Sequence, residues 1–132
     1  MPDLPRILHV EDDEDIREIA LIALETVGGL NVTQCASGPE AIASAARIRP
    51  DVLLLDVMMP GMNGEETLQG LRRLPECADT PAIFMTAKAQ HSDIRRLLDL
   101  GALDVIIKPF DPMTLARQII DIWERRASFR AG

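Results

Sequence analysis

The chain of 132 residues has no long uninterrupted apolar run. No stretch approaches the ~20 apolar residues that a membrane-spanning helix needs. The opening segment, MPDLPRILHV, also lacks the basic start and long apolar run of a leader peptide. We therefore expect a cytoplasmic protein with no membrane partner.

Basic residues and cysteines are also scarce. Fourteen Lys and Arg face 21 Asp and Glu, and the resulting net charge of -7 disfavours nucleic acid as a partner, because phosphate backbones reward excess positive charge. The late cluster of Arg125, Arg126 and Arg130 is expected to be solvated and to hold no ligand. Cys35 and Cys77 lack metal-binding spacing, so we expect a reduced, structural pair.

A hydrophobic content of 47% with 27% charged residues is typical of one soluble globular domain, here spanning 1–132 with a core at about 4–126 and a tail or linker stub at 127–132. Short apolar segments predict five strands, at 6–10, 31–35, 51–56, 82–86 and 104–108. Segments with helical spacing predict five helices: at about 16–27, from Ser37 or Gly38 to just before Pro50, at about 64–74, around Ile94, Leu97 and Leu98 before Gly101, and at about 112–126.

Alternation of strands and helices predicts an α/β fold, a doubly wound parallel sheet with helices on both faces. The near-continuous apolar strands agree, since such strands are buried on both sides. The strand order 2-1-3-4-5 is one common solution. The alternative order 3-2-1-4-5 would place a strand between Asp12 and Asp56 and hold them roughly 10 Å apart.

Polar residues follow four of the five predicted strands. The first strand runs into Glu11 and Asp12, the third ends on Asp56, the fourth on Thr86 and the fifth on Lys108. Each has an ordinary explanation alone: Asp12, Asp13 or Asp15 could simply cap the first helix, Thr86 could be a turn hydroxyl, and Lys108 could be a solvated lysine. Because ligand sites in such sheets lie beyond the carboxyl ends of the strands, the set together predicts one pocket.

Carboxylates gathered in one pocket repel one another, and a hard divalent cation compensates them. Mg²⁺ prefers oxygen ligands and combines one or two carboxylates with phosphate oxygens. We expect Asp12 and Asp56 to bind it directly and Glu11 to bind through water. Lys108 and Thr86 would then bind a phosphate, and Asp56 would be the nucleophile that accepts a phosphoryl group.

Four segments together resemble the receiver domains of two-component response regulators: ILHVEDDEDIR, DVLLLDVMMPGMNG, IFMTA and GALDVIIKPF. The resemblance covers the chain from about residue 4 to 126. It implies a flavodoxin-like fold and a phosphorylation-activated signalling switch, not an enzyme with a separate substrate. It also implies that a sensor histidine kinase or histidine phosphotransfer protein donates the phosphoryl group to Asp56.

The resemblance assigns further roles near that residue. The backbone carbonyl of Met58 would be a Mg²⁺ ligand, and Thr86, Ala87 and Lys108 would surround the phosphate. The Lys108–Pro109 peptide bond is expected to be cis. Val105 stands where many relatives carry an aromatic residue that moves inward on activation, so the resemblance does not extend to that form of coupling.

The predicted output surface consists of the fourth helix, the fifth strand and the fifth helix. The fifth helix carries two apolar stripes, one with Leu115, Ile119 and Ile122 and the other with Ala116, Ile120 and Trp123. Together they are wider than burial on a core requires. The surplus could bind a downstream protein or a second copy, and Asp104 and Arg117 could be part of such a contact, so a monomer or a weak dimer is expected.

Three other functions compete with this interpretation. A Mg²⁺-dependent phosphatase with an aspartyl intermediate would need a second acid at the position of Met58. A nucleotide-binding module would need a glycine-rich loop where the acids follow the first strand. A receiver-like module could bind its partner without phosphorylation. Neither His9, expected to be packed, nor His91, expected to be solvated, predicts a phosphohistidine carrier.

Overall fold

The computed structural model describes residues 4–88 and 90–126. One parallel sheet has the order β2-β1-β3-β4-β5, which confirms the predicted fold class and excludes the order 3-2-1-4-5. Its strands are β1 (Arg6–Val10), β2 (Asn31–Cys35), β3 (Val52–Asp56), β4 (Ala82–Thr86) and β5 (Asp104–Ile107). The predicted tail, 127–132 with Arg130, lies outside the described residues.

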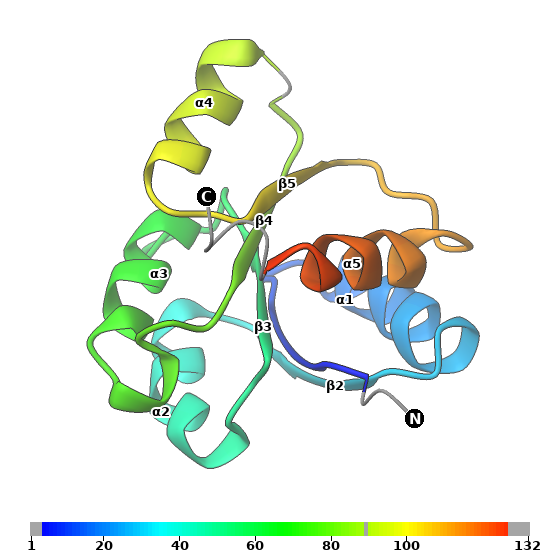
Figure 1. Ribbon diagram of the computed structural model, residues 1–132, viewed down its shortest axis with the longest axis horizontal. Helices are drawn as coiled ribbons and strands as arrows, with labels where there is room; N and C mark the ends of the chain where they lie inside the picture. The colour runs from blue at the N-terminus through cyan, green and yellow to red at the C-terminus, as the bar shows by residue number, and fades with distance from the viewer. Residues whose placement is uncertain (1–3, 89, 127–132) are drawn as a thin grey trace.

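Five α-helices cover the two faces of the sheet (Figure 1): α1 (Glu14–Leu21), α2 (Gly38–Ile48), α3 (Gly64–Arg72), α4 (His91–Asp99) and α5 (Leu115–Glu124). Helix α1 continues as a π-helical segment, η1 (Ile22–Val27), and a short 3₁₀ turn, η2 (Pro75–Cys77), precedes β4. Figure 1 shows α2 and α3 on one face and α1 and α5 on the other. Within the described ranges, no helix is both long and apolar enough to span a bilayer.

Successive side chains of the central strands alternate between two cores, as the period of two along a strand requires. Leu53 and Leu55 join the core beneath α2, α3 and α4, whereas Leu54 joins the core beneath η1 and α5. All five residues of β3 and all five of β4 are buried. Burial on both sides therefore explains the continuous leucine run that ends on Asp56.

Several predicted boundaries differ from those in the structure. Strand β5 ends at Ile107, so Lys108 lies in the following loop, before the cis Lys108–Pro109 bond that the resemblance implied. Helix α5 begins three residues later than predicted, because Asp111 first forms a turn that accepts bonds from the Met113 amide (2.9 Å) and the Thr114 amide (3.1 Å). Strand β3 begins at 52 and helix α3 ends at 72.

The apolar stripe predicted for the first helix is only partly correct. Ala20 and Ala23 are fully buried, but Ile19 is 47% exposed and Val27 44% exposed. The small alanines let the helix approach the sheet, and Ile19 falls at the edge of that contact. Val27 lies in the π-helical segment, whose wider turn shifts the phase that a 3.6-residue period assumes.

Candidate functional site

Three acidic residues follow β1, and they have different roles: Asp13 caps helix α1, whereas Glu11 and Asp12 lie close to Asp56. Asp13 is the N-cap of α1 and accepts a hydrogen bond from the Ile16 amide (3.1 Å). Glu11 is only 1% exposed, and its Oε2 accepts a bond from the Asp13 amide (3.2 Å). Asp12 is exposed. The capping alternative is therefore correct for Asp13, and Glu11 and Asp12 remain candidate ligands.

Asp56 lies at the end of β3, where the following loop is held close to the backbone. The Gly64 amide donates to the Val57 carbonyl (3.0 Å), and a Cβ at Gly64 would lie 2.2 Å from the Asp56 carbonyl oxygen. Asn63 and Glu66 form a reciprocal capping box at the start of α3. The loop therefore returns across the end of β3 and leaves the Asp56 side chain only 4% exposed.

Lys108 joins the acids at the end of the neighbouring strands. Its Nζ donates to Glu11 Oε1 (2.8 Å) and to Asp56 Oδ1 (2.9 Å). Carboxylate oxygens of Glu11, Asp12 and Asp56 all lie within 4.8 Å of one another. Thr86, which is buried, accepts a bond from the Lys88 amide (3.1 Å) through its hydroxyl oxygen. The structure thus brings the predicted acids and lysine into one cluster.

The cluster shifts the protonation of its members. The pKa of Glu11 is raised to about 7: burial and the nearby Asp56 charge raise it, and the hydrogen bond from Lys108 partly opposes them. Burial lowers the pKa of Lys108, but the two carboxylates outweigh that effect, and its pKa rises above the usual value. Lys108 is therefore charged at neutral pH, while Glu11 is close to its titration midpoint.

The acidic cluster fits a small hard cation. Oxygen ligands on opposite sides of an octahedral Mg²⁺ lie ~4.2 Å apart. The carboxylate oxygens of Glu11, Asp12 and Asp56 lie within 4.8 Å of one another, so they are close enough to bind one ion. The Met58 side chain is 59% exposed and offers no acid, so the phosphatase alternative finds no second carboxyl there. The role of its backbone carbonyl stays a prediction.

Arg17 reaches back from α1 to the loop that carries the acids, a contact that the sequence analysis missed. Its Nη1 donates to the carbonyl oxygens of Glu11 (2.8 Å) and Asp12 (3.0 Å). A signal was available, because Arg17 stands four residues after Asp13, one helical turn into α1.

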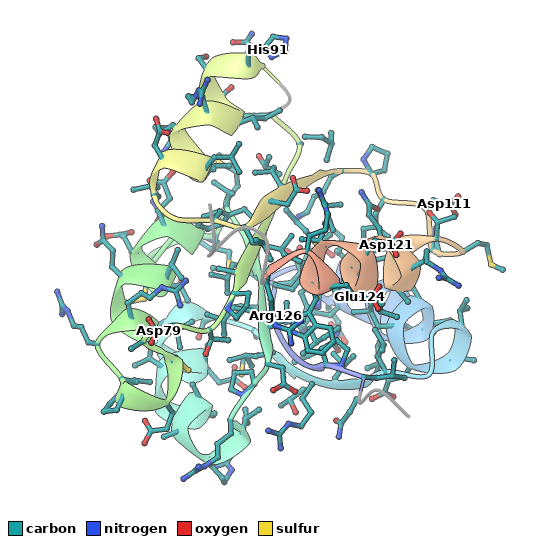
Figure 2. All side chains as sticks on the ribbon, viewed as in Figure 1. Asp79, His91, Asp111, Asp121, Glu124 and Arg126 are labelled. Atoms are coloured by element: carbon teal, nitrogen blue, oxygen red, sulfur yellow. The ribbon has the colours of Figure 1, made fainter. Side chains whose placement is uncertain are left out.

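His9 is packed as predicted, inside the sheet. It is fully buried, and Nδ1 lies 3.1 Å from Gln34 Nε2, directly across the β1–β2 register. Its Nε2 finds no hydrogen-bond partner among the described residues. Burial, together with the charges of Lys108 and Arg17, lowers the pKa of His9 to about 3. His91 is exposed at the tip of α4 (Figure 2), also as predicted.

Residues 7–120 match the family model of the response regulator receiver domain. The chain is 39% identical over 108 residues to the DNA-binding dual master transcriptional regulator RpaA of Synechocystis sp., covering 82% of this chain and 44% of that protein. It is 38% identical over 125 residues to the transcriptional regulatory protein CseB of Streptomyces coelicolor, covering 95% and 52%. The chain therefore spans about half the length of these relatives.

Solved structures agree with the family match. The chemotaxis protein CheY4 of Vibrio cholerae superposes with a TM-score of 0.83 at 30% identity, covering 91% of this chain and 99% of that one. The receiver domain of the Francisella response regulator 1452 superposes with a TM-score of 0.81 at 27% identity, covering 92% and 98%. The chain belongs to the receiver domains of two-component response regulators, which are phosphorylation-activated signalling switches.

Proposed function

We propose that this receiver accepts a phosphoryl group on Asp56 from a phosphohistidine of a sensor histidine kinase or a histidine phosphotransfer protein. Asp12, Asp56, the Met58 carbonyl and, through water, Glu11 would hold Mg²⁺. One observation carries the proposal: Lys108 Nζ lies 2.9 Å from Asp56 Oδ1, inside a cluster of three carboxylates. A phosphate bound there would meet a cation and the acids that hold a metal.

The transfer needs little beyond positioning and charge stabilisation. A carboxylate oxygen of Asp56 attacks phosphorus as the phosphorus–nitrogen bond breaks, and the departing imidazole takes up a proton. Lys108 then binds a phosphate oxygen. The Thr86 hydroxyl oxygen accepts from the Lys88 amide, so its own proton is available to the phosphate. Bound Mg²⁺ would neutralise charge on the transferred group.

The donor protein would approach along an apolar groove beside Lys108. This groove, about 360 Å³, is lined by Ile16, Ile19, Ala87 and Phe110 among others, and Lys108 forms part of its wall. The exposed Ile19 side chain gives a partner an apolar contact next to the phosphate position. The small side chain of Ala87 leaves this approach open.

If the donor protein docks in this groove, a substitution there should slow transfer from a histidine kinase but not transfer from a small phosphodonor. Ile19→Lys should slow transfer from a histidine kinase that phosphorylates the wild type, because the charge opposes apolar docking. Transfer from phosphoramidate, which needs no groove, should be unchanged. Equal slowing with both donors would contradict docking in this groove.

We further propose that phosphorylation changes the surface formed by α4, β5 and α5. Part of the surplus apolar face of α5 is covered by the domain itself, because Ile120 and Trp123 pack against the core. The Arg126 guanidinium lies 3.8 Å from the centroid of the Trp123 ring, and Asp104 pairs with Arg125 at 3.1 Å. These contacts favour a regulated protein partner, or at most a weak dimer, over a large apolar dimer face.

The relatives are about twice as long as this chain, which is consistent with a receiver that forms part of a longer regulator. A receiver that acts as a separate protein is the alternative. Phosphorylation, in both cases, adds roughly -1.5 to -2 charge units beside Thr86 and Lys108. Those residues lead directly into α4 and α5. Val105 is half-buried in β5, so this switch would work through loop movement without an aromatic side chain at that position.

Intact mass measurement after incubation with phosphoramidate tests the proposal. The wild type should gain one phosphoryl group with Mg²⁺ and little with EDTA, whereas Asp56→Asn should gain none. Asp51→Asn is the matched control, because Asp51 precedes the same strand at its opposite end and should leave the gain unchanged. An unmodified wild type would support phosphorylation-independent binding instead.

A further inference from the structure

Arg17 makes an unusual contact with the loop that bears the acids. A single guanidinium nitrogen bridges two consecutive backbone carbonyls, those of Glu11 and Asp12, at 2.8 and 3.0 Å. The Arg17 amide also donates to the Asp13 carbonyl (3.0 Å). Consecutive residues of this loop are thereby held by one residue of α1, through both its backbone and its side chain.

We propose that Arg17 is a positioning residue for the cation site, fixing the backbone from which the Glu11 and Asp12 carboxylates project toward Asp56. The inference rests on the proposed function, because it assumes that these acids bind Mg²⁺. Arg17 is assigned no contact with the metal or the phosphate. It acts by keeping two ligands in place before the ion arrives, which lowers the cost of ordering them on binding.

The arginine is itself held from inside the sheet. Gln34 Nε2 donates to the Arg17 carbonyl (2.8 Å) and lies 3.1 Å from His9 Nδ1. Because the Gln34 amide nitrogen can only donate, His9 Nδ1 is the acceptor of that bond. His9 and Gln34 are register partners in β1 and β2, the two strands that precede and flank the acid loop. A rigid part of the sheet therefore supports the helix turn that carries Arg17.

Electrostatics and positioning predict opposite effects when Arg17 is replaced. Arg17 is a cation beside an acidic cluster, so its charge alone weakens the binding of another cation. Its removal should then tighten Mg²⁺ binding. If Arg17 acts by positioning, its removal should weaken Mg²⁺ binding despite the lost repulsion. The sign of the change therefore distinguishes the two roles.

The test compares Arg17→Met and Arg17→Lys with the wild type in the unphosphorylated protein. Mg²⁺ affinity is measured by titration calorimetry, and the rate of phosphorylation by phosphoramidate is measured against Mg²⁺ concentration. Arg17→Met should weaken Mg²⁺ binding roughly tenfold, the low end for residues that orient metal ligands. The maximal rate at saturating Mg²⁺ should change little. Arg17→Lys, which keeps a donor, should fall between.

Arg72 provides a matched control elsewhere in the fold. Its Nη1 also bridges two backbone carbonyls, those of Cys77 (2.9 Å) and Thr80 (2.5 Å). Those carbonyls lie in the segment that leads into β4, away from the acid loop. Arg72→Met should lower stability toward urea, as Arg17→Met does, yet leave Mg²⁺ affinity at the wild-type value.

Three outcomes would overturn the proposal. Unchanged or tighter Mg²⁺ binding by Arg17→Met would show that the contact does not position the acids. An equal loss in Arg72→Met would assign the effect to general destabilisation. A wild type that binds no Mg²⁺ would refute the proposed cation site itself, and this proposal with it, so the two failures are distinguishable.

Discussion

Lys108 places one ammonium group between two buried carboxylates, those of Glu11 and Asp56. In the absence of a metal it is the cation that compensates them. Removing one partner of a buried ion pair leaves charge without compensation, at a cost of about 3 kcal/mol. The same removal takes away a cation that repels Mg²⁺, so stability and metal binding should respond in opposite directions.

Lys108→Met should therefore lower the free energy of unfolding by about 3 kcal/mol in EDTA. Added Mg²⁺ should restore more stability to this variant than it adds to the wild type, because the acids then depend on the metal alone. Urea unfolding with and without Mg²⁺ measures both effects. Lys88→Met, at an exposed neighbouring lysine, is the control. An equal response to Mg²⁺ in Lys108→Met and wild type would contradict this account.

The roles of some residues could be predicted from the sequence, and those of others could not. Asp56 and Glu11 could be predicted because Asp56 ends a buried strand and Glu11 follows another, and parallel strands bring their carboxyl ends to one edge. The spacing of Arg17 from Asp13 was a signal for its contact with the acid loop, but the bridge also depends on a side-chain rotamer that returns to that loop, and the sequence does not fix this rotamer. The exposure of Ile19 was missed for a similar reason, since a stripe of apolar residues does not fix which of its edges meets the sheet.

At the scale of elements, the β3–α3 connection is held by a close backbone approach. A methyl group at Gly64 would meet the Asp56 carbonyl at 2.2 Å, and backbone cannot yield as a flexible side chain does. Gly61 in the same loop has φ +73° but open space around its Cβ position. The two glycines are thus required for different reasons.

Gly64→Ala should destabilise the protein more than Gly61→Ala, which should cost about 1 kcal/mol for the left-handed backbone alone. Gly64→Ala should also reduce phosphorylation of Asp56 by displacing its backbone. Urea unfolding and intact mass measurement with phosphoramidate check the two effects. A smaller loss of stability for Gly64→Ala than for Gly61→Ala would show that the loop relaxes freely.

Helix α4 buries few side chains against the rest of the domain. Leu97 is its buried residue, Ile94 and Leu98 are half-buried, and Arg96 pairs with Glu65 at the start of α3. Figure 1 shows the helix extending beyond α3 at the edge of the molecule. A helix with so little buried surface is suited to move when the loop after β4 changes.

Amide hydrogens of α4 should therefore exchange with solvent faster than those of α3, whose Thr67, Leu68 and Leu71 are buried. Hydrogen exchange read by mass spectrometry measures the difference. Equal protection of both helices would argue against α4 as the mobile output element.

For the whole molecule, the strand order could be predicted because the alternation of elements and the acids agreed on it. The order β2-β1-β3-β4-β5 makes β1 and β3 neighbours, so Asp12 and Asp56 can share an ion. Element ends were less predictable. The late start of α5 depends on the turn at Asp111, which competes locally with the helix.

The pH dependence of global stability follows from Glu11. Its pKa rises from 4.5 to about 7 on folding, so between those values the folded protein keeps a proton that the unfolded chain has lost. Stability from this group is therefore lost as pH rises through that window. Relative to Glu11→Gln, the metal-free wild type should lose about 3 kcal/mol between pH 4.5 and pH 8. Urea unfolding in EDTA checks this, and parallel curves for the two proteins would contradict it.

The central claim is that Asp56 is the phosphoryl acceptor, and locating the modified residue tests it most directly. The protein is phosphorylated with phosphoramidate and Mg²⁺, the acyl phosphate is trapped by borohydride reduction, and the digested chain is sequenced by tandem mass spectrometry. The account predicts a single modified residue, Asp56. Modification at Glu11, Asp12 or another residue, with Asp56 unchanged, would contradict it.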